Sequence, residues 1–160
     1  MTPNASVVAF ETDGLDSNGE PDIYVRDLDA GSTTLASTAD GSAADGGRHP
    51  AVDDSARFVV FESDGALVGD DATTEAIDEA DTNGTSDVYV RDLLNATTAR
   101  ISVNDKGDQS IGSSTNAAVS STGRFVAFVS SAVIDDGVGE GNERPCDPPA
   151  PDVVGGGGEG

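Results

Sequence analysis

The chain reads Asp81-Thr-Asn-Gly-Thr-Ser-Asp87-Val-Tyr-Val-Arg-Asp92-Leu93 at its centre, and nearly the same stretch occurs earlier, as Asp16-Ser-Asn-Gly-Glu-Pro-Asp22-Ile-Tyr-Val-Arg-Asp27-Leu28. A second unit, Arg57-Phe-Val-Val-Phe-Glu-Ser63, returns as Arg124-Phe-Val-Ala-Phe-Val-Ser130, and its shortened first copy is Val7-Val-Ala-Phe-Glu-Thr12. Repeats of this size indicate structural units that stack on one another and share a core.

The spacing of the repeats is regular once one insertion is allowed for. Phe10 and Phe61 lie 51 positions apart, whereas Phe61 and Phe128 lie 67 apart. Of the 16 extra residues, 14 fall between Phe61 and Asp87, which lie 26 positions apart against 12 for Phe10 and Asp22, and a long loop near 66–80 is inserted there. Without these 14 residues the second spacing is 53. A period of about 50 residues matches the four-stranded blades of β-propellers.

Composition and local pattern predict an all-β fold. The 20 Gly and seven Pro punctuate short apolar runs rich in β-branched and aromatic residues, and no long stretch has helical periodicity. The predicted class is a partial β-propeller of four-stranded antiparallel blades, about two and a half of them. The expected strands lie near 7–11, 22–27, 33–37, 49–53, 57–62, 87–92, 98–103, 116–120 and 124–129.

Two stretches resemble a known repeat. Ala51-Val-Asp-Asp-Ser-Ala-Arg-Phe-Val-Val-Phe-Glu-Ser63 and Ala118-Val-Ser-Ser-Thr-Gly-Arg-Phe-Val-Ala-Phe-Val-Ser130 are similar to the Ser-Pro-Asp-Gly-Lys-x-Ile-Ala-Phe-x-Ser unit of WD40-like, TolB-type propellers. The repeat's Pro-Asp is missing from both copies, and its Gly survives only as Gly123. The resemblance covers roughly residues 5–132 and implies a propeller fold. It leaves function open, because such propellers serve as binding platforms, as peptidase domains and as parts of surface proteins.

The predicted domain organisation has two parts. Propeller-like repeats occupy 1–134, with units near 7–53 and 57–120 and a partial unit at 124–134. The segment 135–160 is rich in Gly and Pro, is acidic, holds the single Cys, and is expected to be disordered. It is interpreted either as a truncated or frameshifted end or as a genuine flexible tail.

The small number of blades leaves three interpretations open. Propellers usually have 4–8 blades, and a terminal repeat exposes apolar surface. The chain is therefore a fragment of a longer reading frame, a protomer that closes a ring by self-association, or an open stack with exposed ends. Self-association is expected if the chain is complete.

Charge is the second strong signal. Thirty Asp and Glu stand against eight Lys and Arg, and Lys106 is the only Lys, giving a formal net charge of −22. Such a surface repels nucleic acid and anionic membranes, so no nucleic-acid partner and no membrane insertion are expected. Strong acidity with almost no Lys resembles haloarchaeal adaptation to high salt. The alternative is an acidic extracellular protein that binds calcium.

The Asp-x-Asn-Gly-x-x-Asp loops are the candidate metal sites. Hard oxygen ligands at positions 1, 3 and 7 around a Gly turn suit Ca²⁺, which takes six to eight oxygens. The same pattern also suits a tight turn, because Asn-Gly favours hairpins and Asp caps nearby backbone N–H groups. The two interpretations can coexist. The candidate ligands are Asp16, Asn18, Asp22, Asp81, Asn83 and Asp87.

The repeated Arg-Asp dipeptides at the ends of the Tyr-Val strands are predicted to pair between neighbouring blades and to fix their register. Their repetition favours a structural role over ligand binding. His49, the only His, is matched by Asn116 in the next repeat and is expected to be a hydrogen-bonded turn residue. The predicted blade pairs are formed by Arg26, Asp27, Arg91 and Asp92.

The predicted function is a non-catalytic binding or scaffold module adapted to high salt, with a protein or glycan partner. The sequence has no nucleophile elbow, zinc-protease motif or phosphate loop, and Cys146 has no partner for a disulfide. Two alternatives stay open: a propeller piece of a larger hydrolase, or a surface or assembly protein that joins through open sheet ends. No signal peptide is recognised, and the resemblance implies an extracytoplasmic location if a longer precursor exists.

Overall fold

A computed structural model describes residues 6–15, 19–38, 46–65, 67, 81–104 and 107–132. These residues form nine strands and no helix. The described part of the chain therefore contains no helix that could cross a membrane. The predicted all-β class is confirmed. The predicted tail at 135–160 lies outside the described residues. The strands are β1 (Val7–Thr12), β2 (Asp22–Asp27), β3 (Ser32–Leu35), β4 (Arg48–Val52), β5 (Phe58–Ser63), β6 (Asp87–Asp92), β7 (Thr97–Arg100), β8 (Ser114–Val119) and β9 (Val126–Ser130).

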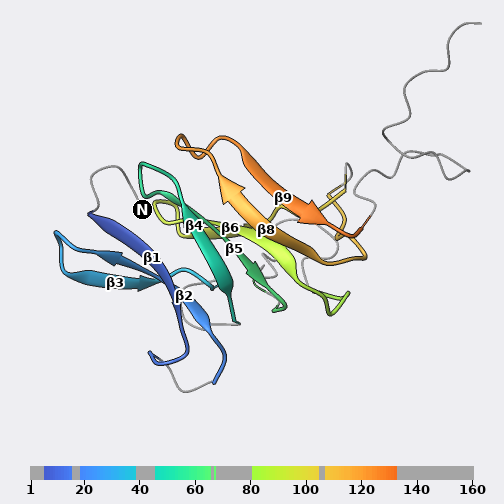
Figure 1. Ribbon diagram of the computed structural model, residues 1–160, viewed down its shortest axis with the longest axis horizontal. Helices are drawn as coiled ribbons and strands as arrows, with labels where there is room; N and C mark the ends of the chain where they lie inside the picture. Colours follow the sequence, from blue (N-terminus) through green and yellow to red (C-terminus); the bar gives the residue numbers. More distant parts are fainter. Residues whose placement is uncertain are drawn as a thin grey trace, which may run out of the picture.

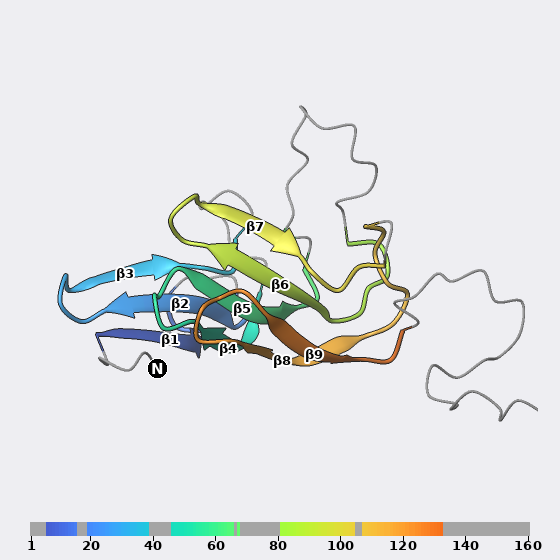
Figure 2. The same cartoon turned by 90° about the horizontal axis from the view of Figure 1, so that it is seen from above.

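The strands form three antiparallel sheets that follow one another along the chain (Figure 1). The first sheet has the order β1-β2-β3, the second β4-β5-β6-β7 and the third β8-β9. The strands β1, β4 and β8 lie side by side along one edge of the molecule (Figure 2). This arrangement is consistent with a partial propeller. The sheets are offset by one strand from the units 7–53 and 57–120, because β4 pairs with β5 and not with the first sheet.

The core forms where the first and second sheets face each other. The Phe-Val-Val-Phe run of β5 is apolar on both faces, as expected for a strand covered on both sides, and Val59, Val60 and Phe61 have no exposed surface. Ile23 of β2 and Tyr89 of β6 are also completely buried and belong to the same cluster as Val59 and Phe61. The repeated apolar strands therefore supply the shared core that stacked units need.

The same aromatic pair recurs in the first two sheets. Phe10 lies opposite Tyr24, and Phe61 lies opposite Tyr89, in the strand register. Both pairs stack with ring centroids 6.0 Å apart. Burial raises the pKa of the Tyr89 hydroxyl, which donates a hydrogen bond to the Gly65 carbonyl at 2.9 Å. The repeated sequence thus produces a repeated cross-strand contact.

The strand ends differ in places from the sequence-based prediction. A strand was expected near 98–103, but β7 ends at Arg100. The hydroxyl of Ser102 accepts the Val88 N–H at 3.1 Å and donates to Asp87 at 2.6 Å, so a side chain replaces the backbone ladder there. The third strand of the first sheet ends early for the same reason.

Gly47 allows β4 to begin close against the first sheet. A Cβ at this position would lie 2.8 Å from Cγ1 of Ile23 and 2.9 Å from Cβ of Ser37. Both distances are shorter than ordinary carbon contacts, so any side chain would push the sheets apart. The glycine therefore fixes the close approach of the first and second sheets.

Ala56→Gly is expected to raise the free energy of unfolding by about 1 kcal/mol, because Ala56 has φ +57° and left-handed backbone is unfavourable for Ala. The equivalent residue of the third sheet, Gly123, has φ +70°. The reverse change, Gly123→Ala, is expected to destabilise, because its Cβ would collide with the Phe58 ring. Chemical denaturation of both variants at one salt concentration checks the pair, and a destabilised Ala56→Gly protein would contradict the prediction.

Candidate functional site

Neighbouring sheets are joined by a repeated glutamate contact. The Glu11 carboxylate on β1 accepts the backbone N–H of His49 on β4 at 3.1 Å. The Glu62 carboxylate on β5 accepts the backbone N–H of Asn116 on β8 at 2.7 Å. Glu11 and Glu62 occupy the same position of the repeat, and so do His49 and Asn116. One motif therefore links the first sheet to the second and the second to the third.

A local irregularity in the receiving strand makes each contact possible. His49 has φ +54° and Asn116 has φ +57°. Each lies inside a register shift, between Arg48 and Ala51 in β4 and at the corresponding place in β8. A bulge of this kind leaves a residue outside the ladder and redirects its groups. The freed N–H is then available to the carboxylate of the preceding sheet.

A cleft of about 490 Å³, lined by several charged residues, opens beside these junctions. Its volume falls in the range of small-ligand sites. It receives residues from loops next to the first sheet, from the second sheet and from β8. The lining residues are Glu20, Gly46, Gly47, Arg48, His49, Glu62, Ser63, Asp64, Gly65, Ser86 and Thr115.

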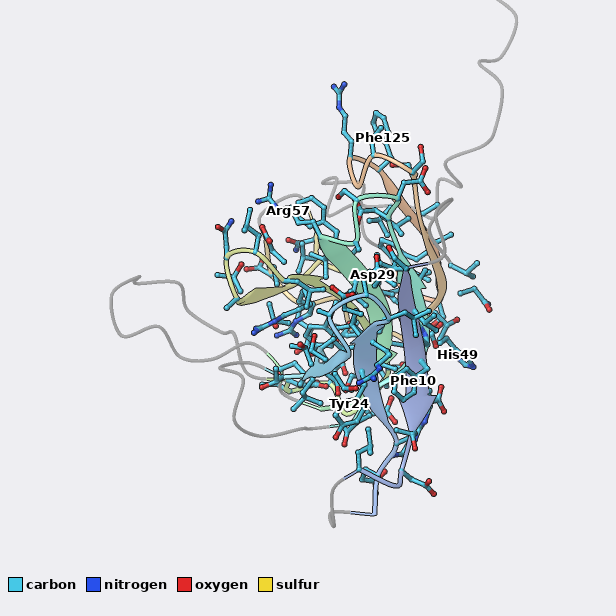
Figure 3. The ribbon with its side chains drawn as sticks, turned by 90° about the vertical axis from the view of Figure 1, so that its left-hand side faces the viewer. Phe10, Tyr24, Asp29, His49, Arg57 and Phe125 are labelled. Atoms are coloured by element: carbon cyan, nitrogen blue, oxygen red, sulfur yellow. The ribbon has the colours of Figure 1, made fainter. Side chains whose placement is uncertain are left out.

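The cleft contains paired charges of both signs. His49 Nδ1 lies 3.0 Å from Oε2 of Glu62, whose side chain is almost completely buried, while the His49 ring is largely exposed (Figure 3). The hydrogen bond to Glu62 raises the pKa of His49, and Glu11 adds to this. Arg48 and Asp64 form a second, exposed pair at 3.5 Å. Carboxylates outnumber cations in the cleft lining.

Glu62→Gln is expected to return the pKa of His49 toward its ordinary value, measured by NMR titration of the imidazole ring. Because the folded-state pKa is raised, the wild-type contribution to stability is present below about pH 6.5 and is lost as pH rises through the folded pKa. The ring is mostly exposed, so this contribution is only a few tenths of a kcal/mol. Glu11→Gln is the control and should lower the pKa less. An unchanged pKa in Glu62→Gln would contradict the assignment.

The second Asp-x-Asn-Gly-x-x-Asp loop is closed by its own hydrogen bonds. The Asp81 carboxylate accepts the Asn83 N–H at 3.2 Å and the Gly84 N–H at 3.4 Å, and Gly84 has φ +62°. The Gln109 side-chain amide donates to Asp81 at 2.8 Å and to Asp87 at 2.7 Å. The turn chemistry predicted for this loop is therefore present.

Calcium binding at these loops stays a prediction. Within the described residues there is no group of three or more His, Cys, Asp or Glu side chains placed to hold a metal ion. In the first loop, Asp16 and Asn18 lie outside the described residues. Asp22 is buried and accepts a hydrogen bond from the Ser37 hydroxyl at 3.0 Å. Asp81, Asn83 and Asp87 do lie together, joined by Gln109.

The predicted Arg–Asp pairs have several kinds of partner. Arg91 reaches the neighbouring sheet and donates to the Thr38 carbonyl at 3.3 Å. Asp92 pairs with Arg57 of its own sheet, at 2.6 Å and 3.1 Å, and this guanidinium holds the pKa of the Asp92 carboxyl well below its usual range. Arg26 donates to the Gly31 carbonyl at 2.8 Å, and the Asp27 carboxylate accepts the N–H groups of residues 29 and 30.

The sequence interpretation missed the glutamate junctions and Gln109. A signal for the junctions was present, because Glu11 and Glu62 share one repeat position while Val129 replaces them in the third copy. Gln109 had no such signal. It lies 22 residues beyond Asp87, in a connection without a repeat counterpart among the quoted motifs.

No protein-family model matches the sequence, and no curated protein matches it. Among solved structures, the chain is similar to the crystal structure of TolB from Acinetobacter baumannii, with a TM-score of 0.43 and 20% sequence identity. The match covers 80% of this chain and 25% of the TolB chain. The chain thus spans about a quarter of the length of that protein.

Proposed function

We propose that the chain is a non-catalytic binding module, built of propeller-type repeats, that takes a basic side chain of a partner protein into the cleft. The observation that carries the proposal is that one cleft of about 490 Å³ is lined by residues associated with all three sheets, at junctions held by the repeated glutamates. Rigid sheets that position a shared cleft are suited to recognition.

The charge of the cleft supports a cationic ligand group. Glu20, Glu62 and Asp64 line the cleft together with Arg48 and the titratable His49. A Lys or Arg side chain entering beside Asp64 shares this exposed carboxylate with Arg48 and does not compete for the buried junction bonds of Glu62. In molar salt the Debye length falls to about 3 Å, so recognition must rest on such short contacts rather than on long-range steering by the net charge.

NMR titration of the isotope-labelled chain in about 1 M KCl tests the proposal, with a tripeptide carrying one Arg and, separately, the neutral disaccharide maltose. We expect the peptide to shift the amide signals of Gly46, Gly47 and Gly65. Asp64→Asn is expected to weaken binding up to about fivefold, the range of exposed ion pairs.

Asp29→Asn is the matched control, because it removes the same charge from an exposed position outside the cleft (Figure 3). It should leave peptide affinity unchanged. Equal weakening by both variants would mean diffuse attraction to the acidic surface and would overturn the proposal. Binding of maltose alone would assign the cleft to a glycan instead.

A further inference from the structure

We propose that the outer edge of β9 accepts an extended segment of the type Asp-Val-Tyr-Val-x-Asp, supplied from outside these 160 residues. The strand that holds the same place in the second sheet, β5, is paired on one edge with β4 and on the other with β6. Within the described part of the chain, β9 pairs only with β8. An unpaired edge of this kind is a template for strand addition.

Apolar side chains in and next to β9 are exposed. The equivalent residues of the second sheet are less exposed, since Phe58 is half-buried and Glu62 is buried. In the third sheet, Phe125 just before β9 is 64% exposed and Val129 within it is 60% exposed. Figure 3 shows Phe125 at the end of the molecule away from His49. The opposite edge of β9 faces β8, where Val129 pairs with the cleft residue Thr115. Apolar side chains exposed at an open edge point to a partner rather than to solvent.

The two complete copies of the repeat show which chemistry fits the edge. In each, the Phe of the first strand stacks on the Tyr of the next, with centroids 6.0 Å apart. Phe128 is the equivalent Phe in β9, in register with Phe61. A strand added antiparallel to β9 in the β5-β6 register places its Tyr opposite Phe128. The edge therefore selects an aromatic residue at that position.

A charged residue adds a second point of recognition. In the second sheet, Arg57 lies over the Phe58 ring at 4.6 Å and makes a bidentate pair with Asp92, the last residue of β6. Arg124 repeats the contact with the ring, because it lies over Phe125 at 5.1 Å. The carboxylate partner would be supplied by an Asp of the bound segment, three residues after its Tyr. Arg–carboxylate pairs of this geometry are directional, so they also fix register.

The described residues leave no free strand of this type for the edge. Both Asp-x-Tyr-Val-Arg-Asp strands, β2 and β6, are already paired on both sides. The residues outside the described ranges, 133–160 among them, contain no Phe, Tyr or Trp that could stack on Phe128. The occupant is therefore a segment from outside these 160 residues that has Tyr and Asp at the spacing found in the repeat.

A labelled peptide with the sequence of residues 85–101, which spans β6 and β7, provides the probe. Fluorescence anisotropy with the whole chain in about 1 M KCl is expected to show saturable one-to-one binding. Changing the peptide residue that corresponds to Tyr89 to Ala should weaken binding about tenfold, the scale of an aromatic pair. Arg124→Ala in the protein should weaken it comparably, and Arg48→Ala in the cleft should not.

Exchanging the two charges of the proposed Arg–Asp pair distinguishes this contact from nonspecific electrostatic attraction. Arg124→Asp in the protein should abolish binding of the wild-type peptide and restore it for a peptide with Arg in place of the residue corresponding to Asp92. Equal binding of a scrambled peptide, or no saturable binding by folded protein, would overturn the proposal. So would sedimentation showing that two copies associate through β9 and exclude the peptide, since the occupant would then be a second copy. None of these three results tests the function proposed for the cleft.

Discussion

Replacing Asp87 by Ala is expected to lower the free energy of unfolding by about 3–5 kcal/mol, the cost of leaving a buried charge without its partner. Asp87 has no exposed surface and lies 3.6 Å from Nη1 of Arg100, whose side chain is 4% exposed. The same carboxylate accepts hydrogen bonds from the side chains of Ser102, Gln109 and Asn83. Its removal therefore leaves a buried guanidinium without this counter-charge and breaks three side-chain hydrogen bonds.

The first sheet provides a matched control. Asp22 holds the same repeat position, is also buried, and accepts the equivalent hydroxyl bond from Ser37. Leu35 stands opposite Tyr24 where Arg100 stands opposite Tyr89, so no arginine faces Asp22 at that position. Asp22→Ala should cost only about 1–3 kcal/mol, the cost of lost buried hydrogen bonds.

Urea denaturation of both variants in about 1 M KCl measures the difference. The high salt keeps the net charge screened, so the comparison isolates the buried groups. Equal losses of stability in the two variants would show that Arg100 does not depend on Asp87. A loss in Asp22→Ala that exceeds the loss in Asp87→Ala would also contradict the argument.

The strand positions could be predicted from the sequence because each unit of the repeat occurs at least twice. The apolar runs that became β5 and β6 alternate with turn residues, and the stacked Phe–Tyr pairs recur because the strands share one register. Periodicity of this kind is local, and it survives in the folded chain because the core needs those side chains at those spacings. The all-β class and antiparallel sheets were predictable for this reason.

The junctions between sheets could not be predicted in the same way. They depend on left-handed backbone at His49 and Asn116. His and Asn adopt this conformation more often than most residues, but only in a small fraction of cases, so their presence alone does not predict it. The loop contacts of Gln109 depend on the path of a connection without a repeat. Both are long-range contacts, fixed only when separate strands have assembled.

The partners of the charged side chains show the same limit. The Arg-Asp dipeptides were expected to pair between blades, yet Asp92 pairs with Arg57, the residue just before β5 of the same sheet. Adjacent residues in a strand point to opposite faces, so Arg91 and Asp92 meet different neighbours. The sequence alone does not show which Arg or Lys lies on the same face of a sheet as a given Asp or Glu.

Diluting the chain from about 1 M to about 0.01 M KCl is expected to unfold it. The formal net charge is −22. In unscreened water each pair of like charges 20 Å apart costs about 0.2 kcal/mol, and 22 excess charges make roughly two hundred pairs. Even the fraction of this repulsion that unfolding relieves is comparable with a typical stability of about 5–15 kcal/mol. At 1 M salt the Debye length is about 3 Å, against about 30 Å at 0.01 M, so only the dilute solution leaves the repulsion in place.

Circular dichroism melts across a KCl series measure the effect, and equal osmolarities of sucrose distinguish screening from solute exclusion, since sucrose stabilises without screening. A variant that replaces the exposed Asp13, Asp29 and Asp54 by Lys changes the net charge from −22 to −16. It should stay folded at lower KCl than the wild type, because it has less repulsion to screen. A melting temperature that is the same in molar and millimolar KCl would refute the proposed adaptation to high salt. Equal protection by sucrose would instead assign the effect to burial of surface, leaving the acidic composition to be explained by another function.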